Sequence, residues 1–444
     1  MTTTMMKTKL ALLGCSSCLL WLASATAQKP AAANKSPAVM AYKLIGLNVT
    51  GSEKYTEKEI LPASGLALGQ NVVEADFKEA ARHLGNTGLF SDVSYTFSYS
   101  PAGTKVEFQL TDIDDSKLVP AHFENFVWFS DEQLLSELKK RVPLFKMRMP
   151  VSGTMPDDVE QALQAVIDEK KIPARVDYLR EAPQQGGSLI GVAYRVEALE
   201  INIRNVEFPG ATPDLLPGLQ AATRKLAGAR YMRSPLAQVA SIEFMPVCLH
   251  RGYLKASFAD AQARVVSQAE GEVEVDAILP LTPGKVYSTS SVEWKGNKVI
   301  PADDLQRLIH LPNGQAADAV RLVSDLETVR KLYHGKGYMA AQINPKPVMD
   351  DERSTVHYDL VVNEGDQYKM GEFEVAGLDS QARAHLQAAW KLKEGDPYDS
   401  EYPKKFLNEN SRLVPGDVPW AIGIHEAVNE RDKTVDVTIR FSSK

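Results

Sequence analysis

Cysteine is scarce in this sequence, which has only Cys15, Cys18 and Cys248 in 444 residues. The first two lie in an apolar N-terminal stretch that we expect to be removed, so Cys248 is left alone. A single cysteine cannot form an intramolecular disulfide. Because it lies in the apolar run 244–249, we expect Cys248 to be a small buried hydrophobic residue and not a nucleophile.

Familiar catalytic and nucleotide-binding motifs are also missing. The patterns G-x-x-x-x-G-K-[ST], H-E-x-x-H and G-x-S-x-G do not occur, and the eight histidines never pair at i, i+3 or i+4. The stretch 335–340 matches the dinucleotide pattern G-x-G-x-x-A, but it follows a predicted helix and precedes a predicted strand, the reverse of what phosphate binding requires. We therefore expect no cofactor, no metal and no enzymatic activity.

The sequence also lacks an excess of positive charge. Lys and Arg number 50 against 57 Asp and Glu, which gives a net charge of −7. A mildly acidic chain repels polyanions, so we expect no nucleic acid as the main partner. The acidic clusters at 112–115 and 350–352 lack the glycine and the ligand spacing of a calcium loop, and we interpret them as solvated turns.

The N-terminus has the features of an export signal. Lys7 and Lys9 precede the apolar stretch 10–22, and Ala25-Thr26-Ala27 offers a small-residue cleavage site. An apolar stretch of about thirteen residues is too short to span a bilayer comfortably. We expect residues 1–27 to be a cleaved signal peptide that sends the chain to the periplasm, and residues 28–41, rich in Ala, Lys, Pro and Ser, to be a flexible leader.

A lipid anchor is the alternative for this segment, because Leu12-Leu13-Gly14-Cys15 resembles a lipobox. Cleavage there would leave an apolar region of only about five residues, where seven or more are usual. We therefore do not expect lipidation at Cys15.

What the sequence does contain is an internal repeat of about 80 residues. Each copy ends in a segment that alternates apolar with mostly polar residues, the period of a strand with one face on a core. The five segments are Val106 to Leu110, Ile190 to Val196, Val273 to Leu279, Val356 to Val362 and Val435 to Phe441. One such alternation is weak evidence, whereas five at regular intervals indicate copies of one module.

The start of each copy predicts helices. Thr56-Glu57-Lys58-Glu59 and Ser130-Asp131-Glu132-Gln133 are capping boxes that follow short apolar strands. The segment 322–333 has the apolar spacing of an amphipathic second helix. These signals predict an α+β fold: a tandem array of small two-layer domains, each β-α-α-β-β, with a mixed three-stranded sheet covered by two helices.

Five such domains account for the chain after the leader. Their predicted bounds are 42–113, 118–198, 199–283, 284–364 and 365–444. The second and fifth diverge, because they have Lys171-Ile172-Pro173 and Pro415-Gly416-Asp417 where the other copies have glycine and an aromatic residue.

Glycine and aromatic residues recur at the joints of the repeat. Such pairs follow the second helix and also precede the next opening strand; the residues are Gly88, Gly252, Tyr253, Gly284, Gly337, Tyr338 and Gly365. This pattern resembles the polypeptide-transport-associated (POTRA) family, whose repeats precede the membrane barrel of the outer-membrane barrel-assembly factor and of two-partner secretion transporters. The resemblance covers residues 42–442. Because the last strand ends at Phe441, we expect no membrane barrel to follow.

The resemblance implies a binding mode. In this family the strand just after the glycine–aromatic pair lies at the edge of the sheet, where its unpaired backbone groups can pair with another extended chain. Here these strands would be 92–99, 254–259 and 339–343. The residues expected to bind polypeptide are Asp92, Val93, Ser94, Tyr95, Leu254, Lys255, Ala256, Ser257, Met339, Ala340, Ala341 and Gln342.

The implied function is that of a periplasmic scaffold at the outer membrane. It would bind unfolded client polypeptides or a partner barrel protein by strand addition, during outer-membrane protein assembly or secretion. The alternative is a spacer that holds envelope partners apart, since five compact domains in line would reach about 150 Å. A hydrolase with a site between domains is a third hypothesis, and the oligomeric state is left open.

Overall fold

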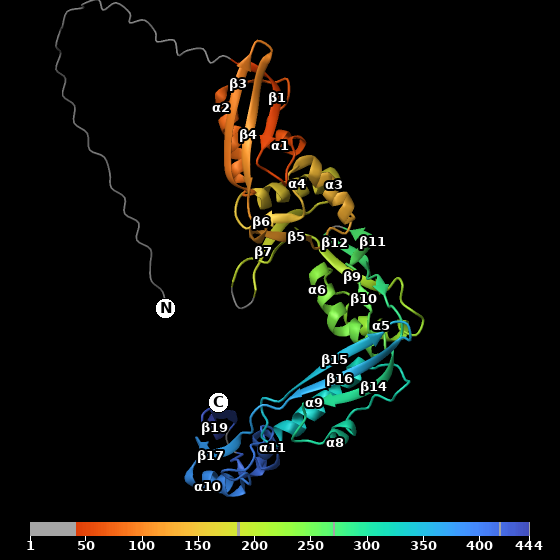
Figure 1. Ribbon diagram of the computed structural model, residues 1–444, viewed down its shortest axis with the longest axis vertical. Helices are drawn as coiled ribbons and strands as arrows, with labels where there is room; N and C mark the ends of the chain where they lie inside the picture. Colours follow the sequence, from red (N-terminus) through yellow and green to blue (C-terminus); the bar gives the residue numbers. More distant parts are fainter. Residues whose placement is uncertain (1–40, 184–186, 270, 417–418, 444) are drawn as a thin grey trace, which may run out of the picture.

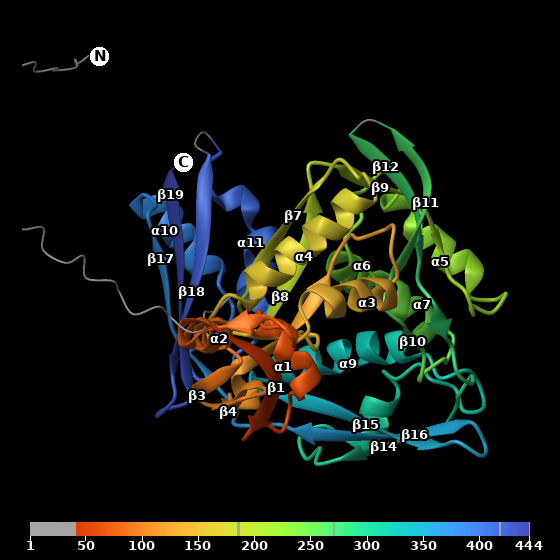
Figure 2. The same cartoon turned by 90° about the horizontal axis from the view of Figure 1, so that it is seen from above.

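The structure is a computed structural model that describes residues 41–183, 187–269, 271–416 and 419–443. The expected signal peptide 1–27 and all but the last residue of the leader 28–41 lie outside the described residues. The chain folds as five successive units, here called units 1 to 5, which follow one another along a bent path (Figure 1). Seen from above, the units are distributed around a common centre instead of lying in a straight row (Figure 2).

Units 1 and 2 each contain a four-stranded sheet, with strand orders β2-β1-β4-β3 and β6-β5-β8-β7. The elements of unit 1 are β1 (Tyr42–Thr50), α1 (Glu57–Ala63), β2 (Asn71–Val72), α2 (Glu74–Asn86), β3 (Phe90–Ser100) and β4 (Gly103–Asp112). A 3-10 turn, Asp115–Lys117, leads into unit 2. Its elements are β5 (Leu118–Phe123), α3 (Asp131–Arg141), β6 (Arg148–Pro150), α4 (Met155–Glu169), β7 (Arg175–Glu181) and β8 (Gly191–Glu197).

Unit 3 has the three-stranded sheet β11-β12-β9 and a separate small pair, β10-β13. Its strands are β9 (Glu200–Glu207), β10 (Ser257–Phe258), β11 (Gln262–Ala269), β12 (Glu272–Ile278) and β13 (Leu281–Thr282). Its helices are α5 (Leu216–Ala222), the 3-10 turn Thr223–Lys225, α6 (Arg233–Val239), a π-helical segment (Ala240–Phe244) and α7 (Met245–His250). The π-helical turn lies just before Pro246, whose ring would clash with a carbonyl of a regular α-helix.

Units 4 and 5 have the sheets β14-β16-β15 and β17-β19-β18. The elements of unit 4 are β14 (Ser288–Lys295), α8 (Ala302–Gln306), α9 (Ala319–His334), β15 (Gln342–Asp350) and β16 (Thr355–Asn363). Those of unit 5 are β17 (Lys369–Ala376), α10 (Ser380–Ala389), α11 (Tyr402–Glu409), the 3-10 turn Ser411–Leu413, β18 (Trp420–Asn429) and β19 (Thr434–Ser443).

The predicted fold class is confirmed. In the main sheet of every unit the first strand pairs parallel with the last, and the strand before the last pairs antiparallel with it; in unit 3 the last strand of the main sheet is β12. The last strand is therefore the centre of the sheet, which explains its strict alternation: in β19 Val435, Val437, Ile439 and Phe441 are at most 2% exposed. Their side chains meet the helices, and the intervening residues face water.

A fourth strand in the sheets of units 1 and 2 was not expected from the sequence. The loop between the two helices pairs antiparallel with the first strand, as β2 in unit 1 and β6 in unit 2. In units 3 to 5 the same pairing is reduced to single bridges, Asn202 with Arg230, Ser288 with Ala316 and Lys369 with Pro397. Segments of one to three residues are too short to show an alternating pattern.

Glycine is required where unit 3 meets unit 4 and where unit 4 meets unit 5. The Gly252 carbonyl accepts a hydrogen bond from the Tyr287 amide at 2.8 Å, and Gly337 accepts from Tyr368 at the same distance. Gly252 and Gly337 have φ of +81° and +88°. A Cβ at Gly252 would lie 2.7 Å from the Tyr287 carbonyl oxygen, and one at Gly337 would meet Tyr368 in the same way. We call this contact the glycine clasp.

Replacing a glycine of the clasp by alanine should destabilise the protein by more than the strain of a left-handed backbone conformation alone. Gly337→Ala is compared with Gly314→Ala in the same unit, because Gly314 also has a positive φ, +78°, but nothing within 4 Å of a Cβ. We expect about 1 kcal/mol of destabilisation for Gly314→Ala, and a further roughly 1–3 kcal/mol for Gly337→Ala through the clash. Urea unfolding measures the difference. Equal losses would show that the clasp contributes nothing.

Candidate functional site

The antiparallel strand that precedes the last strand lies at one edge of each sheet. These edge strands are β3, β7, β11, β15 and β18. Within the described parts of the chain, no further strand pairs with their outer sides. Each edge therefore presents unpaired backbone amides and carbonyls, the groups through which an extended chain can add to a sheet.

In unit 1 the expected residues Asp92, Val93, Ser94 and Tyr95 lie in β3. The strand alternates between two faces. Aromatic side chains pack toward α2, as the 5.3 Å separation of the Phe77 and Phe97 rings shows, whereas the serines and the threonine between them are exposed. The edge strand is therefore anchored by its aromatic side chains, and its exposed face carries small polar side chains.

In unit 3 the expected edge residues do not lie at the edge of the main sheet. Leu254 and Lys255 form a turn, Ala256 follows it, and Ser257 belongs to β10, which pairs with β13. The edge strand is β11, at Gln262–Ala269. The turn is used in the junction to unit 4 instead. Lys255 forms an ion pair of 2.6 Å with Asp351 of that unit, and Gly284 packs against Lys255.

Unit 4 shows the same displacement. Met339 and Ala340 form a turn closed by the Ala341 amide, which donates to the Tyr338 carbonyl at 3.1 Å. Of the residues expected at this edge, Gln342 alone lies in β15, where it is the first residue. Gly365, in the link to unit 5, packs against Ala340. The chain after the glycine–aromatic pair thus serves the domain junction before it becomes an edge strand.

The edge strand of unit 4 also carries two prolines. Pro345 and Pro347 stand two residues apart in β15, so their nitrogens point to the same side of the strand. Proline has no N–H and is tolerated in sheets only where that side faces solvent. Two neighbouring N–H donors are therefore missing from the outer edge. Two carbonyls of an added strand would find no donor there.

The β3 and β18 edges are free of proline and long, with 11 and 10 residues. In β18 Ile422 and Val428 are each 45% exposed, which gives this edge an apolar component. The β11 edge is shorter, with 8 residues. These differences rank β3 and β18 above β11, and β11 above β15, as surfaces for strand addition.

A cleft of about 550 Å³ lies between units 1 and 2 and contains both a histidine and a carboxylate. The Nε2 atom of His83 lies 3.0 Å from a carboxylate oxygen of Glu79. Asp158 accepts a hydrogen bond of 3.0 Å from the Thr154 hydroxyl. Burial raises the pKa of the Asp158 carboxyl. Among the described residues, His83 is thus paired with Glu79 and Asp158 with Thr154, and no hydrogen bond joins the histidine to the aspartate.

Cys248 lies in α7 and is fully buried. Burial raises the pKa of its thiol to about 11. The thiolate, the reactive form, is therefore rare at neutral pH. This agrees with the expectation of a buried hydrophobic residue.

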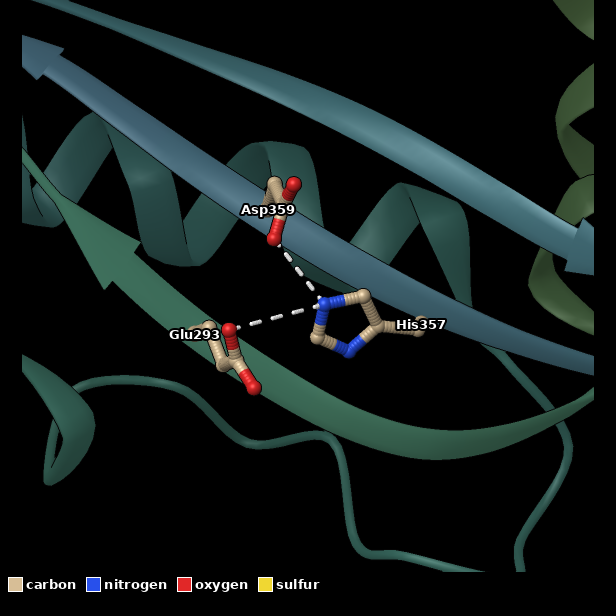
Figure 3. A group of neighbouring side chains, drawn as sticks. All are labelled: Glu293, His357 and Asp359. Atoms are coloured by element: carbon tan, nitrogen blue, oxygen red, sulfur yellow. Dashed lines mark hydrogen bonds and ion pairs between the residues drawn. The ribbon is translucent and has the colours of Figure 1, made fainter.

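One group of side chains was not expected from the sequence. Glu293, His357 and Asp359 lie together on the sheet of unit 4 (Figure 3). His357 and Asp359 are two residues apart on one strand, and Glu293 comes from the neighbouring strand. A search at i+2 would have found the first pair, whereas the third residue depends on strand pairing.

Asp158→Asn should stabilise the protein at pH 7. The folded state raises the pKa of this carboxyl, so ionisation opposes folding at pH values above that raised pKa. Asparagine cannot ionise and keeps the acceptor oxygen for Thr154. Asp157→Asn is the control, because it lies in the same helical turn but accepts from Tyr178 instead.

The stabilisation by Asp158→Asn should disappear as the pH falls to about 3, where aspartate is protonated in both states. Thermal unfolding at both pH values measures it. A loss of stability at pH 7 that equals the loss in Asp157→Asn would contradict the expected effect of burial.

Among the described residues no helix is long and apolar enough to cross a membrane. A sequence model of the family described as surface antigen variable number repeat, POTRA, matches residues 287–365, which span unit 4. The outer membrane protein assembly factor BamA of Neisseria meningitidis serogroup B is 22% identical over 229 residues. That match covers 49% of this chain and 28% of the length of that protein.

Solved structures of similar chains include POTRA domains 3–5 of BamA from Haemophilus influenzae, with 15% identity and a TM-score of 0.43. This match covers 55% of the present chain and 96% of that one. POTRA domains 1–3 of the periplasmic domain of Omp85 from Anabaena match 55% of this chain and 95% of theirs, at 17% identity and a TM-score of 0.24. The POTRA family model thus matches unit 4, and the chain is similar to BamA over 49% of its own length.

Proposed function

We propose that this protein is a non-enzymatic periplasmic scaffold that acts in outer-membrane protein assembly or secretion by binding extended polypeptides. The observation that carries the proposal is the repeated edge: in all five units the same strand of the module has no strand partner on its outer side among the residues that the structure describes. Backbone groups make such a contact, so binding would tolerate many guest sequences. Unfolded barrel precursors, or an exposed strand of a partner barrel protein, offer the extended backbone that this contact requires.

We assign the binding to β3 and β18 first. Both are long, lack proline and pair antiparallel with the central strand on their inner side, with one register shift in β3, between Phe90 and Asp92. The outer surface of β3 carries small polar side chains that leave room for an incoming strand. The residues Asp92, Val93, Ser94 and Tyr95 remain in the proposed site, and those expected near 254 and 339 are replaced by β11 as a secondary edge.

The periplasmic location rests on the expected signal peptide 1–27 and on the similarity to periplasmic domains. In this setting the protein would be peripheral to the outer membrane. The units follow one another along a bent path, so a long client could contact the edges of more than one unit in succession (Figure 1). Such multiple weak contacts increase the overall affinity without making any one contact tight.

A spacer is the second candidate, and the junctions favour it. Units 3 and 4 are held by a glycine clasp and by the 2.6 Å ion pair between Lys255 and Asp351. Units 2 and 3 are linked by Arg233, which forms a 2.6 Å ion pair with Asp131, and by hydrogen bonds from Ser234 to Glu124. Such joints would fix the distance between partners bound at the two ends.

Strand addition predicts a specific pattern of amide protection. When an unfolded outer-membrane barrel protein, diluted from urea, is added to the full chain, hydrogen exchange should slow in β3 and β18. Exchange in β15 should not change, because the prolines remove two outer donors. Mass spectrometry of peptides from the three strands measures this. If hydrogen exchange in β3 and β18 is the same with and without the barrel protein, the result would support the spacer.

Removing the prolines should open the β15 edge. The variant Pro345→Thr/Pro347→Thr restores two outward N–H groups and adds residues that favour strands. We expect it to gain protection in β15 upon addition of the same unfolded protein, and to self-associate more than wild type. Replacing Pro312 and Pro415, which lie outside the strands, by threonine is the control. Equal behaviour of the two double variants would mean that the prolines do not guard the edge.

A further inference from the structure

The cluster of Glu293, His357 and Asp359 lies on the open face of the unit 4 sheet. Strand β14 supplies Glu293, and β16 supplies His357 and Asp359. On β16 the residues between and beside them, Val356, Tyr358 and Leu360, are buried against the helices. Because side chains alternate along a strand, His357 and Asp359 must point to the opposite, wet face. Figure 3 shows all three side chains on that face, with a helix behind the strands.

Strand register brings the three side chains into contact range. Ser291 lies opposite His357, and Glu293 lies opposite Asp359. The Nε2 atom of His357 is 2.9 Å from an Asp359 carboxylate oxygen and 3.9 Å from one of Glu293. One nitrogen and two carboxylate oxygens, one from each residue, lie within 4.8 Å of one another. Small side-chain rotations would bring all three to about 2 Å from a common centre, the distance at which such atoms bind Zn²⁺.

Ser291 orients the imidazole ring. Its hydroxyl oxygen lies 2.6 Å from Nδ1 of His357. When Nδ1 carries the proton and donates to Ser291, the lone pair of Nε2 faces the two carboxylates. An outer hydrogen bond of this kind is the usual support of a histidine that binds a metal. Ser291 is thus a positioning residue, and Nε2 is the ligand atom.

The electrostatics of the cluster favour a cation. Two carboxylates directly opposite each other on neighbouring strands repel. Lys295 relieves part of this repulsion, because its ammonium group lies 2.6 Å from Asp359. With Glu293 and Asp359 charged and one lysine beside them, the group keeps one negative charge in excess.

We propose that Glu293, His357 and Asp359 bind a first-row transition-metal dication of the Zn²⁺ type. An imidazole nitrogen with two carboxylates suits such ions and does not suit Mg²⁺ or Ca²⁺, which prefer oxygen ligands alone. Three protein ligands on an open face leave the remaining coordination position to water. The ion would tie β14 to β16 across the wet side of the sheet, opposite the helices.

Calorimetric titration of the full chain with Zn²⁺ tests the site. We expect wild type to show one binding event that His357→Ala removes and that Glu293→Gln weakens. His425→Ala is the matched control, because His425 is exposed on a strand of unit 5, and it should bind as wild type does. Ser291→Ala should weaken binding by about tenfold or more, the usual effect of losing an outer partner.

Lys295→Met distinguishes the proposed site from a folding defect, because it is expected to tighten binding. This variant removes a positive charge that competes with the metal, so it should tighten Zn²⁺ binding about fivefold or more, whereas a merely damaged site would bind more weakly. Zn²⁺ should also raise the thermal stability of wild type and not that of His357→Ala. The proposal fails if His357→Ala binds Zn²⁺ as wild type does, or if Lys295→Met binds no more tightly.

Discussion

The parallel pairing of the first and last strands determines the architecture of every unit. It places the last strand in the centre, so that its alternate side chains must be apolar, as in Val356, Tyr358 and Leu360 of β16. It makes the chain between these strands cross one face of the sheet, which sends both helices to the same side. It also forces the hairpin strand to the edge. The open edge, the wet face with its charged cluster and the helical layer all follow from this one pairing.

The sequence predicts best those residues that this pairing buries on one side. Most of the closing strands were predicted correctly, because residues such as Val435 and Val437 are buried and alternate with polar ones, whereas Ile190 lies just before β8 and is 54% exposed. The edge strands of units 3 and 4 were misplaced, because Leu254 and Met339 follow the glycine–aromatic pair in sequence but form junction turns. Nothing in local propensity distinguishes such a turn from the first residues of a strand.

Other features depend on contacts between distant segments. The cluster around His357 is invisible to a search at helical spacing, since it combines an i+2 pair with a residue across the ladder. The glycine pattern, in contrast, was visible, although its reason was not. Gly252 and Gly337 are needed because the next unit's backbone occupies the space of a side chain. The positions of the junctions between units could thus be predicted from the sequence, and the structure explains why glycine is needed there.

The prolines of β15 also bear on how the chain reaches its native state. Five similar modules are tethered within one polypeptide, so while they fold, the hairpin strand of one copy competes for the central strand of its neighbour. Such exchange between adjacent repeats is a common source of misassembly in multidomain chains. Because Pro345 and Pro347 remove two donors from the outer side of β15, unit 4 would pair poorly with a half-formed neighbour through that side. It would separate the folding of unit 5 from that of the units before it.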